Sequence, residues 1–146
     1  MPTADAGVLR AMSALRLDRI DTLERAFRSS GGTVAADELA YLLRGRVEQP
    51  LSTVARWIVA PEVVSFEWRS QTLLPLFQFD LAAARLRAPV ADVVRELASV
   101  FDDWDLACWF TEPNAWLGDA APAELVDAHA GAVLAAARAD RFIARG

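Results

Sequence analysis

The sequence predicts a mostly helical protein with one short β-hairpin: an N-terminal winged helix-turn-helix-like unit followed by a C-terminal helical bundle. Three observations support this fold class. The chain is rich in alanine and leucine, 54% hydrophobic and 24% charged, which favours packed helices over disorder. Apolar residues recur at helical spacing along much of the chain. Two short apolar segments near the middle interrupt that spacing and are typical of strands.

The chain length and its single cysteine limit how the fold can be stabilised. A chain of 146 residues can bury a sizeable core without a metal or a disulfide. Cys108 is the only cysteine, so a disulfide framework and a cysteine-based zinc site are excluded. We expect it to pack as a small hydrophobic side chain, and we expect no cofactor.

Helices are predicted first along the N-terminal half. One covers residues 6–28 and ends at the Ser-Ser-Gly-Gly segment 29–32, and a second, short helix begins near Thr33 and continues to residue 43. Pro50 suits the first position of a third helix, where its missing N–H costs nothing. The buried face of that third helix is expected to consist of Leu51, Val54, Ala55 and Ile58.

The hairpin is predicted between residues 63–68 and 73–79, because both segments are rich in β-branched, aromatic and other apolar residues. The connecting residues Arg69, Ser70 and Gln71 would form the turn. Pro75 cannot donate a ladder hydrogen bond, so the second strand is predicted to be an edge strand or to be interrupted there.

The C-terminal half returns to helical spacing. Pro89 opens a helix whose apolar face carries valines and a leucine, and Asp102 with the next aspartate can cap a further helix. The Glu-Pro-Asn segment 112–114 breaks the pattern. Pro122 starts another helix to residue 130, and Gly131 is predicted to divide it from the final helix.

The best domain boundary lies at residues 80–88, which gives units 1–80 and 81–146 that can share one core. The first unit has 9 arginines against 10 acidic residues, the second has 6 against 10, and the chain carries a net charge of −5. Neither unit has the basic surface of a strong DNA binder. Arginine without lysine indicates a GC-rich bacterial genome, and no spanning segment or signal peptide is visible, so we expect a cytoplasmic protein.

No catalytic or metal site is expected. The single histidine, His129, has no second histidine at metal-ligand spacing, and the chain has neither a phosphate-binding glycine loop nor a serine nucleophile elbow. The acidic residues Asp102, Asp103 and Asp105 are best explained as helix capping, although an enzyme that uses them is a third hypothesis. Four tryptophans lie in apolar patterns and are expected to pack in the core: Trp57, Trp68, Trp104 and Trp109.

The predicted order of helices and hairpin is that of a winged helix-turn-helix, with residues 51–60 as recognition helix. The side chains that could meet phosphates or base edges are Arg44, Arg46, Ser52, Thr53, Arg56 and Arg69. Residues 29–80 hold only 4 arginines against 6 acidic residues. Electrostatics therefore favours weak, dimer-dependent contact with operator DNA, or a degenerate domain that binds none.

One segment resembles a known family. Residues 109–126 (WFTEPNAWLGDAAPAELV) resemble the toxin-binding domain of Xre/MbcA/ParS antitoxins, in which a W-hydrophobic-x-x-P-N-x-x-L-G stretch precedes a P-x-[DE]-L helix. Residues 75–80 (PLFQFD) also resemble the segment ahead of that domain. The resemblance covers about residues 75–146, half of the chain. It departs from the usual pattern at Asp119, where a second glycine is common.

The motif residues have physical roles in folding rather than in catalysis. Pro113 stops a helix, Asn114 can hydrogen-bond the turn, and Trp116 and Leu117 are expected to tuck into the bundle. Gly118 allows a positive φ.

The resemblance implies an antitoxin that neutralises a toxin encoded beside it, often a RES-domain enzyme that consumes NAD, and that represses the shared promoter. It also implies a homodimer whose C-terminal residues reach toward the toxin's active site. The expected contact residues are Arg138, Arg141, Phe142 and Arg145; the alternative is a frayed terminal helix that contacts nothing. A second hypothesis is a stand-alone helix-turn-helix transcription regulator, which salt-sensitive, sequence-specific DNA binding would favour.

Overall fold

The computed structural model describes residue 7 and residues 19–145. Residues 19–28 are helical, in agreement with the end of the first predicted helix. The rest of that predicted helix, including Val8, Met12 and Leu15, lies outside the described residues.

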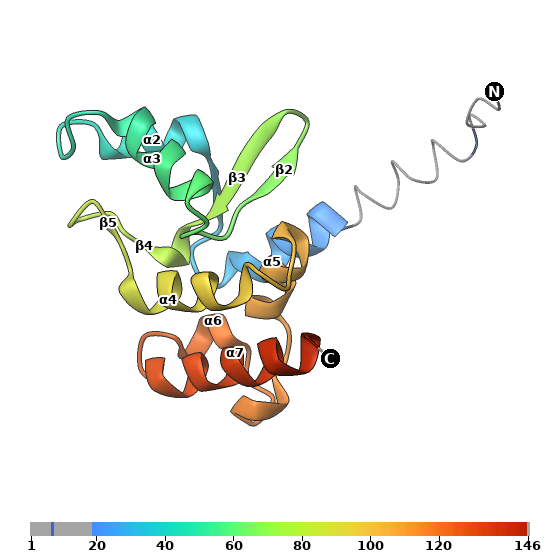
Figure 1. Ribbon diagram of the computed structural model, residues 1–146. Helices are drawn as coiled ribbons and strands as arrows, with labels where there is room; N and C mark the ends of the chain where they lie inside the picture. The colour runs from blue at the N-terminus through green and yellow to red at the C-terminus, as the bar shows by residue number, and fades with distance from the viewer. Residues whose placement is uncertain (1–6, 8–18, 146) are drawn as a thin grey trace.

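The described chain combines helices with a small antiparallel sheet (Figure 1). Helical residues predominate, as predicted. The N-terminal elements are β1 (Thr33–Ala35), α2 (Ala36–Leu43), α3 (Pro50–Val59), β2 (Phe66–Trp68), β3 (Gln71–Pro75), the 3₁₀ turn η1 (Leu76–Gln78), β4 (Phe79–Asp80) and β5 (Arg85–Leu86). The C-terminal elements are α4 (Ala88–Leu97), α5 (Asp103–Thr111), the 3₁₀ turn η2 (Ala115–Leu117), α6 (Pro122–Leu125) and α7 (Ala130–Ala144).

The three-stranded sheet has the order β1-β3-β2, and β4 pairs with β5 in a separate two-stranded sheet. All of these pairs are antiparallel. Its first strand corrects the prediction of a helix from Thr33: residues 33–35 are a strand, and α2 begins only at Ala36. Val34 pairs with Leu74, and this long-range ladder overrides the local helical spacing. β3 is the central strand, so the prediction that Pro75 lies in an edge strand is wrong. The other alternative, a strand interrupted at this proline, agrees with the structure, because β3 ends at Pro75.

The predicted hairpin is confirmed as β2 and β3, with shorter strands than expected. Only Arg69 and Ser70 form the turn, with φ values of +48° and +64°. Two consecutive positive φ angles are typical of a type I′ turn, whose twist matches the flanking strands.

The starts of α3 to α6 follow the predicted signals, but two other helical details differ. Pro50 and Pro89 stand in the first turns of α3 and α4, and Asp102 caps α5. The final helix begins after His129, so Gly131 lies inside its first turn and does not divide two helices. The preceding helix α6 is correspondingly shorter and ends at Leu125.

The buried face of α3 is rotated from the predicted one. Val54 and Trp57 are buried, whereas Leu51 and Ala55 are exposed. The Trp57 ring stacks on Phe79 with centroids 5.6 Å apart, and this large contact determines which side of the helix faces the core.

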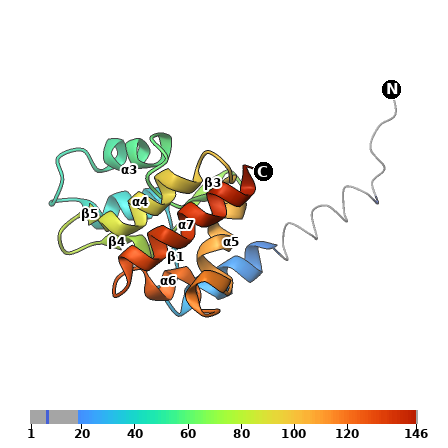
Figure 2. The same ribbon diagram turned by 60° about the horizontal axis from the view of Figure 1, so that its bottom comes forward.

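Two apolar clusters form the core. The larger includes Phe27 and Phe66 from the first predicted unit together with Leu97, Phe110 and Ala137 from the second. The smaller lies beneath α2 and α3 and contains residues from both helices, from β1 and β3 and from β4. Figure 1 shows α4 between the α2–α3 pair and α7, and in the turned view of Figure 2 α4 again lies between α3 and α7. The boundary near residue 80 stays a prediction, although the halves share apolar contacts as expected.

Among the described residues, no helix has both the length and the apolar character needed to cross a bilayer.

Candidate functional site

A polar cluster in the C-terminal half is centred on Asp140, a half-buried residue of α7. The indole Nε1–H of Trp109 donates to its Oδ2 atom and that of Trp116 donates to Oδ1, both at 2.8 Å. The Asn114 amide Nδ2 donates to Oδ2 at 3.3 Å. Hydrogen bonds to an ionised carboxylate are about twice as strong as neutral ones. Asp140 therefore fastens the loop after α5 to the C-terminal helix.

The loop itself is closed by its own hydrogen bonds. The Asn114 side chain accepts the Trp116 backbone N–H at 2.9 Å, and its backbone N–H donates to the Ala120 carbonyl at 3.0 Å. Gly118 and Asp119 both adopt left-handed backbone, with φ of +63° and +65°. The predicted roles of Asn114 and Gly118 are confirmed, and α5 ends at Thr111, just before Pro113. Asp119 occupies the position where the resemblance expects a second glycine.

Trp116 corrects one prediction. Its side chain does not tuck into the bundle: the residue is 58% exposed, and its ring is held by the hydrogen bond to Asp140. Leu117, by contrast, is partly buried against the larger core cluster, as expected.

Of the expected toxin-contact residues, three lie on α7, and the fourth, Arg145, is the C-cap of this helix. Arg138, Arg141, Phe142 and Arg145 have the spacing of one helical face. Phe142 is 82% exposed, and Arg145 at the end of the helix is also exposed. An exposed phenylalanine among three arginines can offer both apolar contact and hydrogen bonds to an anionic group.

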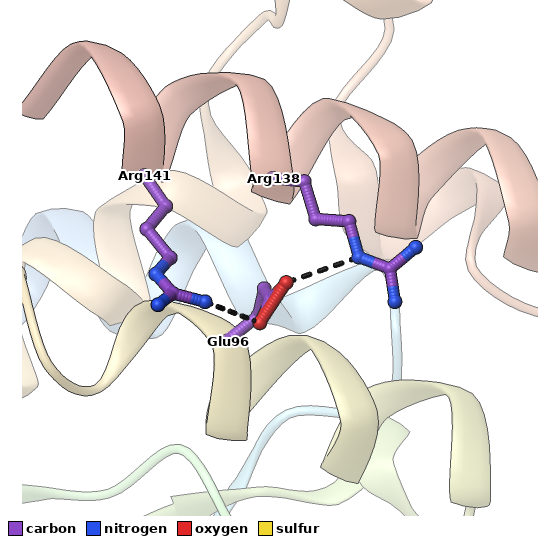
Figure 3. Close-up of polar contacts among 3 residues, drawn as sticks. All are labelled: Glu96, Arg138 and Arg141. Carbon is purple, nitrogen blue, oxygen red and sulfur yellow. Dashed lines mark hydrogen bonds and ion pairs between the residues drawn. The ribbon is translucent and has the colours of Figure 1, made fainter.

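Two of these arginines share one carboxylate from α4 (Figure 3). Arg138 Nε lies 3.0 Å from Glu96 Oε1, and Arg141 Nη1 lies 2.9 Å from Oε2. The Glu96 side chain is mostly buried, while Arg138 remains largely exposed. This fork links α4 to α7 and fixes the orientation of both guanidinium groups.

Three of the expected DNA-contacting arginines are exposed and make contacts within their own chain. The Arg44 guanidinium lies 3.4 Å from the centre of the Tyr41 ring. Arg46 donates to the Ala82 carbonyl. Arg69, in the β2–β3 turn, lies over Trp68 at 4.9 Å.

The outer face of α3 is more apolar than expected of a recognition helix. Ser52 and Arg56 are exposed and Thr53 is half-buried. Beside them, Leu51, Ala55 and Val59 form an exposed stripe at spacing i, i+4, i+8. Leu51 is 69% exposed and Val59 is 82% exposed. Apolar side chains can contact thymine methyl groups but do not bind phosphates.

The acidic residues at the start of α5 have a capping role. Asp102 Oδ1 accepts the backbone N–H of Asp105 at 2.8 Å, which satisfies a free amide of the first turn. In the part of the chain that the structure describes, no three His, Cys, Asp or Glu side chains are grouped to hold a metal ion. His129 is exposed next to α7.

Cys108 is half-buried in α5 against the larger core cluster. Burial raises the pKa of its thiol, and the nearby Glu112 carboxylate raises it further. These surroundings oppose formation of the reactive thiolate. The predicted packing role is therefore confirmed in part, since the side chain keeps some exposure.

Sequence reasoning missed three polar residues that organise the fold around the candidate sites. Gln78 is buried, and its amide both accepts from the Val64 N–H at 2.7 Å and donates to the Val64 carbonyl at 2.8 Å. It is the only polar side chain in the apolar run 73–79, which was an available signal. Asp140 is likewise the only acid in α7. Glu96 offered no comparable signal among the charged residues of α4.

No protein-family model, curated protein or solved structure matches this chain. The resemblance of residues 109–126 to antitoxin domains therefore stays a prediction, which the geometry of α7 can support or weaken.

Proposed function

We propose that this protein is an antitoxin that binds a cognate toxin through the outer face of α7 and occludes its active site. The contact surface consists of Arg138, Arg141, Phe142 and Arg145. Their shared face and the high exposure of Phe142 support one continuous contact area. Large exposed apolar side chains flanked by arginine are typical of residues that carry binding energy.

The observation that carries the proposal is the attachment of the motif to Asp140. Trp109, Asn114 and Trp116, three residues of the resemblance, all donate to this one carboxylate. Phe142 follows two positions later and therefore points to nearly the opposite side of the helix. The motif thus holds the back of α7, while Phe142 and Arg145 on the other side remain exposed. A preformed helix face loses less conformational entropy when it binds.

The arginines suit a toxin that acts on an anionic nucleotide, such as a RES-domain enzyme that consumes NAD. Guanidinium groups match the geometry of phosphate oxygens. Glu96 already pairs with Arg138 and Arg141, so a toxin anion would have to compete with this carboxylate. Arg145 lies beyond the fork, at the end of α7. In this proposal the protein is cytoplasmic, forms a homodimer, and acts by occlusion rather than catalysis.

Growth of cells that express the adjacent gene tests this proposal. Phe142→Asp should abolish rescue from toxicity, because a carboxylate would replace the central apolar contact. Val59→Asp is a matched control, since Val59 has the same exposed fraction of 82% but lies on α3. Rescue should persist with this control. Equal rescue by both variants, at equal protein levels, would contradict the proposed surface.

A second candidate function is a stand-alone transcription regulator. The order β1, α2, α3 and then the hairpin β2–β3 favours it, because this order resembles a winged helix-turn-helix. The exposed apolar stripe on α3 and the arginines that contact their own chain give this function less support. Salt-dependent binding of the purified protein to one promoter sequence, weakened by Arg56→Ala, would support this function, including repression of the antitoxin's own promoter.

A further inference from the structure

A groove with a volume of about 560 Å³ lies between α2 and the start of α3. Tyr41, Pro50 and Leu51 supply its apolar lining, and Asp37 and Arg44 line it as well. We call this feature the α2–α3 groove. Tyr41 is 61% exposed and Leu51 is 69% exposed. Adjacent apolar side chains left open to water mark an interaction site more often than isolated ones do.

The two charged residues of the groove stand near opposite ends of α2, with Arg44 as its C-cap residue. Asp37 and Arg44 are seven residues apart, which places them on one face, about 10 Å from each other along the helix axis. Within residues 19–145, neither belongs to an ion pair: Asp37 accepts the Glu38 backbone N–H, and Arg44 covers the Tyr41 ring. The groove therefore carries one negative and one positive charge beside a shared apolar surface.

We propose that the α2–α3 groove is the interface between two copies of this chain related by a twofold axis. In a twofold dimer, every contact between two different residues occurs twice, once in each direction across the interface. Asp37 of each copy would therefore face Arg44 of the other. Two α2 helices would then run antiparallel, with Tyr41 and Leu51 buried between the two charge pairs. This arrangement covers the exposed apolar side chains and pairs both charges at once.

A second copy suits the groove better than DNA does. The groove has no excess of positive charge, and Glu38 lies next to it on the exposed surface of α2. A phosphate backbone would be repelled by Asp37 and Glu38 and attracted only by Arg44. Seating a second copy would also cover the start of α3. This inference locates the homodimer of the proposed function, but its test requires no toxin, so the two can fail separately.

Charge reversal tests the interface in the full-length protein. Analytical ultracentrifugation should show a dimer for the unmodified chain. Asp37→Arg and Arg44→Asp should each raise the dimer Kd about tenfold or more, because like charges then meet twice in each dimer. An equal mixture of the two variants should form a heterodimer with Kd close to that of the unmodified chain, because both contacts again pair opposite charges. Only a contact between copies predicts this rescue.

Leu51→Glu provides a second variant, with Val59→Glu as its control on the same helix. The first should dissociate the dimer, and the second should leave it intact, with circular dichroism showing that both are folded. A monomeric unmodified chain, or a dimer that survives Leu51→Glu, would overturn the inference. So would failure of the mixed charge variants to associate. Sequence-specific DNA binding lost on Arg44→Asp without any change in dimer Kd would assign the groove to DNA instead.

Discussion

The carboxylate of Asp140 accepts the indole N–H of Trp109 at 2.8 Å and so joins the end of α5 to α7. Trp116 reaches the other oxygen of the same carboxylate at an equal distance. Trp109 is buried whereas Trp116 is mostly exposed, so the pair connects the core to the surface of the C-terminal helix. The indole N–H groups of the two rings, as well as their apolar area, therefore contribute to this connection.

Asp140→Asn should lower the free energy of unfolding by about 1.5–3 kcal/mol, the usual worth of hydrogen bonds to a charged group. The asparagine amide would turn its N–H groups toward indole or amide N–H donors that contact a carboxylate oxygen in the unmodified protein. Urea unfolding followed by tryptophan fluorescence measures the change. Asp127→Asn is the control, because Asp127 is exposed and its ion pair with Arg87 is long, at 3.9 Å. Equal losses in the two variants would contradict the anchor.

Gly118→Ala should destabilise the protein by about 1–2 kcal/mol, since its φ of +63° is costly for a residue with a Cβ. Gly131→Ala is the matched control. Gly131 lies in the first turn of α7, where an added Cβ would meet open space, so alanine there should be neutral or stabilising by up to about 1 kcal/mol. Thermal unfolding distinguishes the two substitutions. A destabilisation that is equal in both would exclude the left-handed turn as its cause.

Asp119→Gly should raise stability modestly, by about 0.5 kcal/mol, because the φ of +65° at this position suits glycine better than aspartate. Asp119→Ala should lower stability, since alanine has neither the freedom of glycine nor a polar side chain suited to this region. Urea unfolding of the two variants gives both signs. A stabilising alanine would show that the loop does not hold this conformation.

Glu96→Gln should lower stability by about 1 kcal/mol at low salt, because it weakens the contacts with Arg138 and Arg141 together. The loss should shrink in concentrated salt, which screens ion pairs. Asp92→Asn removes a more exposed contact with Arg95 within α4 and should cost less. Calorimetry at two salt concentrations tests this order. A larger loss for Asp92→Asn would contradict the role of the fork.

Cys108 should react slowly with iodoacetamide near pH 8. Burial and the Glu112 carboxylate raise the pKa of its thiol, so the folded protein holds less thiolate than an unfolded chain at the same pH. The folded rate should therefore rise only at higher pH, and unfolding in urea should increase the rate at pH 8. Mass spectrometry follows the alkylation. A folded protein that reacts faster than the urea-unfolded one would overturn this prediction.

Local signals in the sequence predicted the starts of α3 to α6 and the position of the hairpin turn. Pro50, Asp102 and Gly118 act through their own backbone or their nearest neighbours, so their roles follow from residue type and position. The strand at residues 33–35 escaped prediction because it depends on pairing with β3, far along the chain. Such long-range pairing leaves no periodic signal in the strand's own sequence.

The candidate site was predictable only in part, for the same reason. The resemblance implied Phe142 and its neighbouring arginines as contact residues, and the structure places them at the spacing of one helical face. The partners of that helix, Glu96 and the indole of Trp116, lie on other elements, and only the tertiary packing brings them to α7. In the sequence, Trp116 has apolar neighbours and therefore resembles a core residue, although the structure exposes its side chain.

Co-expression of the tagged full-length protein with the product of the adjacent gene tests the antitoxin proposal most directly. Growth with the neighbouring gene alone and co-purification of the two proteins are measured together. We expect the neighbour to be toxic alone and harmless with this protein, and a stable complex that is lost on Phe142→Asp but kept on Val59→Asp. A harmless neighbour that does not co-purify would contradict the proposed function.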